Sequence, residues 1–111
     1  MNGIAADADW IAVIINRATR QIGEPTARET AELTDDLVTA ANTLLPQLDL
    51  SRVPPPRRAR LARAVTTSRF LIEHKRSGLG VDGGFCTDLG CQLRRIQYAV
   101  LHYNPPPDHG S

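Results

Sequence analysis

Aromatic residues are few in this sequence. Trp10, Phe70, Phe85, Tyr98 and Tyr103 are the only ones among its 111 residues. Because β-sandwich cores are rich in aromatic and β-branched side chains, this scarcity argues against a sandwich. It favours closely packed helices with an aliphatic, alanine-rich core.

Long apolar runs are also missing. The apolar run over residues 10–15 is far shorter than the roughly 18 to 20 residues that a transmembrane helix needs. The N-terminal segment carries two acidic residues and no basic region, unlike a secretory signal. We therefore expect a cytoplasmic protein that crosses no membrane.

Cysteine is limited to Cys86 and Cys91, which a helix would place about 140° apart, so they cannot form a disulfide with each other there. A zinc site would need more ligands, and no histidine stands at a typical metal-binding spacing. The histidines are His74, His102 and His109. We predict reduced thiols and no metal or other cofactor. A ligand- or metal-binding helical bundle around Cys86, Cys91 and His102 is kept as an alternative.

Signatures of catalysis are absent as well. Asp35 and Asp36 are adjacent, so a helix turns them to different sides, and no histidine triad accompanies them. The glycine-rich residues 77–85 lack both the preceding strand and the lysine of a phosphate-binding loop. We therefore expect no enzymatic activity.

Lysine is nearly absent, with one lysine against twelve arginines, and charge is divided unevenly along the chain. Residues 1–50 carry three basic and eight acidic residues, a net charge of −5. Residues 51–111 carry ten basic and four acidic residues, a net charge of +6. Such a division indicates an acidic partner, a nucleic acid, or an acidic helix set against a basic one, within one chain or between two copies.

Apolar residues at helical spacing predict a first helix over residues 7–22. Asp7 or Asp9 is placed to cap its N-terminus, and Gly23 is expected to end it. The inner side of this helix consists of Ile11, Ile14, Ile15, Ala18 and Ile22.

A second helix is predicted over residues 26–48. Thr26 and Glu29 have the spacing of a capping box, in which each side chain accepts a hydrogen bond from the other residue's backbone N–H. Pro46 should tighten the last turn and end the regular helix near Leu45, because proline lacks the N–H that the helix needs.

A third helix is predicted over residues 56–76, opened by Pro56 and ended by Gly78 as a left-handed cap. Residues 49–56 are expected to form a semi-rigid extended connector before it. The apolar side of this helix consists of Leu61, Ala64, Val65, Ser68, Leu71 and Ile72.

The last predicted helix, residues 86–103, has Thr87 or Asp88 as its cap. Its inner residues follow the clearest heptad of the chain, which suits antiparallel packing in a bundle. They are Leu89, Leu93, Ile96, Val100 and Tyr103. The proline-rich residues 105–111 are expected to be a disordered tail.

The third helix carries most of the positive charge, which raises the alternative of a nucleic-acid-binding regulator. The residues that would bind are Arg57, Arg58, Arg60, Arg63 and Arg69. On a helical wheel the arginines spread around this helix and form no single stripe. We favour the interpretation that their aliphatic stems lie along the edge of the core with the charged heads in water.

Three large residues lie opposite the core stripes of the last two helices. They are Phe70, Tyr98 and Leu101. A four-helix bundle needs only one apolar stripe per helix, so large residues on the backs of helices indicate a second packed surface. We predict that they form an interface between two copies of the chain.

Two segments and the arginine- and alanine-rich third helix resemble a family of short, uncharacterised, all-helical proteins from Streptomyces and related actinobacteria. The first segment, residues 33–46, has the pattern L-x-x-x-L-V-x-x-A-x-x-L-L-P, and the second is residues 93–103. The resemblance implies an actinobacterial cytoplasm and assigns no activity to any residue.

Together these patterns predict one all-α domain over residues 1–104, a mostly antiparallel four-helix bundle. We expect a small non-enzymatic protein–protein interaction or regulatory module that forms a homodimer. The nucleic-acid-binding regulator and the ligand- or metal-binding bundle are the two alternatives.

Overall fold

The computed structural model describes residues 3–20, 26–76 and 83–104. Over these residues the chain is all-α, as predicted. The elements are α1 (Gly3–Thr19), α2 (Ala27–Leu44), two 3₁₀ turns η1 (Leu45–Gln47) and η2 (Leu50–Arg52), α3 (Pro55–Arg76) and α4 (Gly83–Tyr103). Within the described ranges, no helix is long and apolar enough to cross a membrane.

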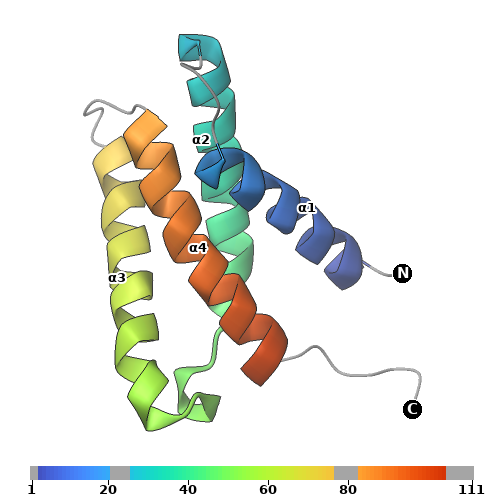
Figure 1. Cartoon of the computed structure of the whole chain (residues 1–111), viewed down its shortest axis with the longest axis vertical. Coiled ribbons are helices and arrows are strands. Elements are labelled where there is room, and N and C mark those ends of the chain that lie inside the picture. The colour runs from blue at the N-terminus through green and yellow to red at the C-terminus, as the bar shows by residue number, and fades with distance from the viewer. Residues whose placement is uncertain (1–2, 21–25, 77–82, 105–111) are drawn as a thin grey trace.

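The bundle is organised around α4, which contacts each of the other three helices. Figure 1 shows α3 antiparallel to α4 and beside it, and α1 lying across α2 and α4. The predicted heptad explains this central position, because Leu89, Leu93 and Ile96 are fully buried and Val100 is nearly so, although its last member, Tyr103, is only half-buried. Leu37 of α2 and Ile11 of α1 complete the same core.

By contrast, α3 packs less deeply. Leu61, Ala64 and Ser68 are buried, but Val65 and Ile72 of the predicted stripe are only partly covered. The buried Ser68 hydroxyl donates to the carbonyl oxygen of Ala64 at 2.7 Å. Because small residues make much of the contact between α3 and the core, the long side chains of α3 lie along the borders of that contact and remain exposed.

Two predicted boundaries of α2 are confirmed. Thr26 Oγ1 accepts a hydrogen bond from the Glu29 N–H at 3.1 Å, and Glu29 Oε1 accepts one from the Thr26 N–H at 3.2 Å. The regular helix ends at Leu44, and the following 3₁₀ turn contains Pro46. Local backbone chemistry therefore places the start of α2 and the tightening near Leu45, but the predicted range to residue 48 is too long, because residues 45–47 form a 3₁₀ turn.

The predicted caps of the first and last helices are wrong. Asp7 and Asp9 lie inside α1, which already begins at Gly3, because the alanines before Asp7 favour helix. Thr87 and Asp88 lie inside α4, whose first turns bury Phe85 and Cys86 in the core.

The connector before α3 is not simply extended, because residues 50–52 form a 3₁₀ turn. The Asp49 carboxylate accepts hydrogen bonds from both the N–H and the hydroxyl of Ser51, which favours a turn over an extended chain. The turn ends at Val53, and α3 begins at Pro55, one residue before the predicted start.

Several predictions fall outside the described residues. They concern the cap at Gly23, the Gly78 cap, most of the glycine-rich segment 77–85, His109 and the tail 105–111. The predicted extension of the first helix to residue 22 is wrong, because α1 ends at Thr19 and Arg20 lies in a turn.

Candidate functional site

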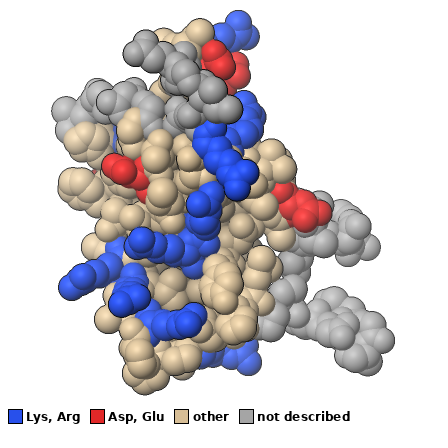
Figure 2. All heavy atoms as spheres, viewed as in Figure 1, with Lys and Arg blue, Asp and Glu red and all other residues tan. Residues whose placement is uncertain are grey.

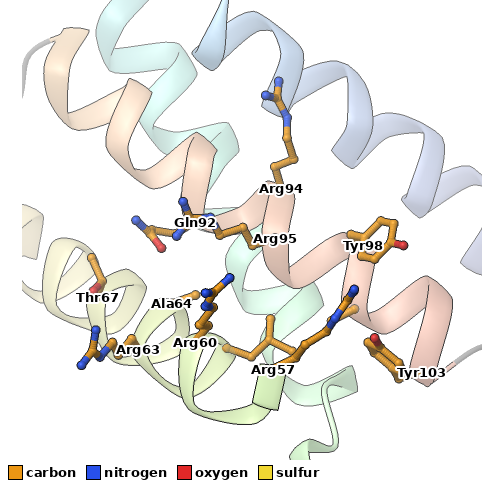
Figure 3. A pocket seen from close by; sticks show the side chains of 12 residues that line it. Arg57, Arg60, Arg63, Ala64, Thr67, Gln92, Arg94, Arg95, Tyr98 and Tyr103 are labelled. Atoms are coloured by element: carbon orange, nitrogen blue, oxygen red, sulfur yellow. The ribbon is translucent and has the colours of Figure 1, made fainter. Parts of the chain in front are cut away.

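A groove with a volume of about 870 Å³ runs between α3 and α4. Leu61 and Ala64 of α3 and Ala99 of α4 line its buried part. Because two of these three side chains are only a methyl group long, the longer side chains on either side stand above them as walls. Figure 3 shows this arrangement from close by.

Arginines supply most of the walls, and we call this feature the arginine groove. Arg57, Arg60 and Arg63 recur every three residues along α3, and Arg95 extends over the groove from α4. With a rise of 1.5 Å per residue, the three arginines of α3 cover about 9 Å of helix axis. In Figure 3 the side chains of Arg57 and Arg60 extend toward α4 and Arg95 extends from the opposite wall, whereas the Arg63 guanidinium points away from α4 at the outer edge of the groove.

A fifth arginine, Arg94, borders the groove but is used elsewhere. Its guanidinium points away from the other arginines (Figure 3) and donates to Thr19 Oγ1 and Asn16 Oδ1 of α1. Arg94 therefore links α4 to α1, and its hydrogen bonds hold it away from a ligand in the groove.

Within residues 3–20, 26–76 and 83–104, no acidic residue lines the arginine groove. The ion pairs between described residues include Arg28–Glu32 on α2 and Lys75–Asp35 between α3 and α2, and neither of these involves a wall arginine. In Figure 2 the basic side chains gather on the face formed by α3 and α4, and most acidic ones lie toward its edges. Several like charges around one hollow attract anions and raise their local concentration.

One end of the arginine groove is aromatic. Tyr98 and Tyr103 line it there, and the side chain of Arg57 extends toward this end (Figure 3). The Tyr98 ring is stacked on His102, with ring centroids 5.5 Å apart and planes 15° apart. His102 in turn meets the edge of Tyr103, with centroids 4.7 Å apart. Tyr98, His102 and Tyr103 of α4 thus form one continuous set of rings.

The structure divides the five arginines predicted for nucleic-acid binding. Arg57, Arg60 and Arg63 lie together in the groove. Arg58 donates from Nε and from a terminal nitrogen to the Val53 carbonyl, at 3.3 and 3.0 Å, and so holds the start of α3. Arg69 borders a separate hollow that faces Leu45 and Pro46.

Sequence reasoning missed Arg95. A helical wheel describes one helix at a time, and around the axis of the third helix the arginines do point in different directions. The groove arises because α4 lies antiparallel beside α3 and supplies the opposite wall (Figure 1). The adjacent pair Arg94 and Arg95, next to the buried Leu93 and Ile96, was the signal available.

The three predicted interface residues are exposed, as the wheel predicted. The exposed fractions are 66% for Phe70, 57% for Tyr98 and 51% for Leu101. They do not share one hollow: Tyr98 lines the arginine groove, Leu101 borders a small hollow beside Ala8 of α1, and Phe70 lines neither. Their use as a dimer interface stays a prediction.

The cysteines and histidines are not brought together as metal ligands. Cys86 is buried with its Sγ 3.3 Å from Thr34 Oγ1, whereas Cys91 is half-buried. His74 lies against Phe70, and His102 against the two tyrosines. Across residues 3–20, 26–76 and 83–104, no group of three or more histidine, cysteine or acidic side chains could hold a metal ion.

Comparison of the chain with family models, with curated proteins and with solved structures gives no match.

Proposed function

We propose that this protein is a small non-enzymatic binding module that holds the phosphate backbone of a nucleic acid in the arginine groove. The observation that supports this most strongly is the set of four wall arginines, with no carboxylate among the described residues that line the groove. Basic side chains on a protein surface are commonly paired with acidic side chains nearby. Two of the described acids, Glu32 and Asp35, pair elsewhere, with Arg28 of α2 and with Lys75 near the end of α3.

The chemistry of the side chains suits phosphate. A guanidinium group presents a planar fork of N–H donors that matches a phosphate in two parallel hydrogen bonds. It also stays charged at any physiological pH. Arginines three residues apart on α3 can therefore contact successive anionic groups of one polymer. A single small anion would leave some of these arginines without a partner.

This proposal follows the alternative of a nucleic-acid-binding regulator that the sequence raised, but it assigns the binding to a different set of arginines. Arg57, Arg60 and Arg63 are kept, Arg95 is added, and Arg58 is removed because its donors already serve the Val53 carbonyl. Arg69 is removed because it borders a different hollow.

Fluorescence anisotropy with a labelled oligonucleotide tests the proposal. We expect salt-dependent binding, with log K falling against log salt at a slope of about −3 for a single strand that contacts four arginines. In Arg60→Gln with Arg63→Gln, affinity should fall and the slope should be about half as steep, because two of four contacts are lost.

The matched control is Arg17→Gln with Arg20→Gln. It removes the same charge from two exposed residues, again three apart, but near the end of α1 and outside the set of residues that line the groove. Affinity should stay near that of the wild-type protein. Equal loss in both double variants, or equally tight binding of polyglutamate, would contradict the proposal, because the groove would then act only through net charge.

A further inference from the structure

The aromatic end of the arginine groove indicates which form of nucleic acid it takes. Tyr98 is 57% exposed although its ring is stacked on His102, so a large part of the ring surface is open. Tyr103 lies at the same end and is held in place by packing against the small cluster of Val53, Leu61 and Ala99. An ordered ring with an open face beside cationic side chains is what base stacking requires.

The shape of the site points the same way. A duplex is usually read by a protruding helix or ribbon that enters its major groove, about 12 Å wide. Here the arginines stand around a hollow between two helices, and its lower part is lined by Leu61, Ala64 and Ala99. A duplex could touch only the upper ends of the walls, whereas a single strand can lie between them. The bases of a single strand are also free to leave their own stack.

We infer that the arginine groove binds single-stranded nucleic acid, with the phosphates along Arg57, Arg60, Arg63 and Arg95 and one base stacked on Tyr98. Arg57 extends from α3 toward the tyrosines (Figure 3), so it is placed to hold the phosphate next to the stacked base. His102 supports the Tyr98 ring from its other side. This inference rests on the proposed function and adds the strandedness of the ligand and a role for Tyr98.

The experiment compares one labelled sequence as a single strand and as a duplex, by anisotropy with the full-length chain. The single strand should bind on the order of tenfold more tightly than the duplex. Tyr98→Ala should weaken single-strand binding by about tenfold, which is the scale of one lost base stack. Duplex binding and the salt slope should not change, because no charge is removed.

Tyr98→Phe is the matched control. It keeps the ring and loses only the hydroxyl, so single-strand affinity should stay within about twofold of wild type if stacking is the contact. Circular dichroism of each variant confirms that the helices are retained. Because Tyr98 is exposed, both variants should unfold at nearly the wild-type urea midpoint.

The outcomes separate the two proposals. If neither form of nucleic acid binds, both the proposed function and this inference are wrong. If both forms bind equally, or Tyr98→Ala binds the single strand as well as wild type does, the inference is wrong. In that case an effect of Arg60→Gln with Arg63→Gln would still support the proposed function.

Discussion

The side-chain amide of Asn104 forms two hydrogen bonds with the backbone of Asp49. Its Oδ1 accepts from the Asp49 N–H at 2.8 Å, and its Nδ2 donates to the Asp49 carbonyl oxygen at 3.3 Å. The residue just after α4 is thereby tied to the connector that leads into α3. Because Tyr103 precedes Asn104, this pairing also helps to fix the aromatic end of the arginine groove.

Asn104→Ala should lower the free energy of unfolding by about 1 kcal/mol, which is typical for the net loss of hydrogen bonds that water can partly replace. Urea denaturation measures this change. Asn42→Ala is the control, because Asn42 is an exposed asparagine on α2. Coincident midpoints for Asn104→Ala and the wild-type protein would show that the pairing contributes nothing.

Asp49 should titrate below the ordinary aspartate value. Hydrogen bonds from the Ser51 hydroxyl and N–H, and the nearby charge of Arg52, lower the pKa of the Asp49 carboxyl from 3.8. A pKa lowered on folding stabilises the protein above the unfolded-state pKa, and this contribution is lost as pH falls through the folded-state pKa. Asp49→Asn should therefore lose less stability than wild type on acidification. An NMR titration that places the Asp49 pKa at or above 3.8 would contradict this.

Gly90 of α4 packs directly against Ala18 and Thr19 at the end of α1. A Cβ added there would lie 2.8 Å from Ala18 Cβ and 3.1 Å from Thr19 Cγ2. Overpacking of this kind costs about 1 to 3 kcal/mol, and the better helix propensity of alanine returns at most about 1 kcal/mol. We expect Gly90→Ala to lower the free energy of unfolding by about 1 kcal/mol, measured in urea.

Two further variants isolate the cause at Gly90. Gly84→Ala changes an exposed glycine of the same helix and should be neutral or slightly stabilising. In an Ala18→Gly background, which removes the nearest methyl group, Gly90→Ala should cost less than it does alone. Strictly additive effects in this double-mutant cycle would show that the two residues do not interact.

The parts of the fold that sequence predicted are those set by local pattern. The capping box of Thr26 and Glu29 and the tightening at Pro46 involve residues a few positions apart, so the sequence contains the whole interaction. The start of α4 did not follow from local signals, because burial of Phe85 and Cys86 extends the helix beyond the cap expected at Thr87. Thr87 Oγ1 instead donates to the Ala18 carbonyl oxygen on α1.

The arginine groove could be predicted only in part, because it depends on contacts between helices that are far apart in the sequence. The helical wheel spread the arginines of the third helix around its surface, but it had no means to place Arg95 of α4 opposite them. That placement depends on which helices are neighbours and in which direction they run. Nor could the sequence show that Arg58 donates hydrogen bonds to the Val53 carbonyl oxygen or that Arg94 donates to Thr19 of α1.

Thr26→Ala should cost on the order of 1 kcal/mol, because it leaves the Glu29 N–H without its side-chain acceptor at an exposed helix end. Thr39→Ala is the control on the same helix. Its hydroxyl bonds to the Asp35 carbonyl in mid-helix, so replacing it should have little effect or stabilise slightly. A Thr26 variant as stable as the Thr39 variant would show that the capping box does not stabilise α2.

Self-association, predicted from the sequence, is tested by Phe70. This ring is 66% exposed and contacts His74, which lies one turn further along α3. If two copies bury it, light scattering at micromolar concentration should give a dimer, and Phe70→Asp should dissociate that dimer because a carboxylate would be desolvated in the interface. Half-molar salt should weaken the dimer little, since apolar contact and not screened ion pairs would hold it.

Val13→Asp is the control, because Val13 is also apolar and 55% exposed but lies on α1. A wild-type monomer under these conditions, or equal dissociation by both variants, would remove Phe70 as the interface residue.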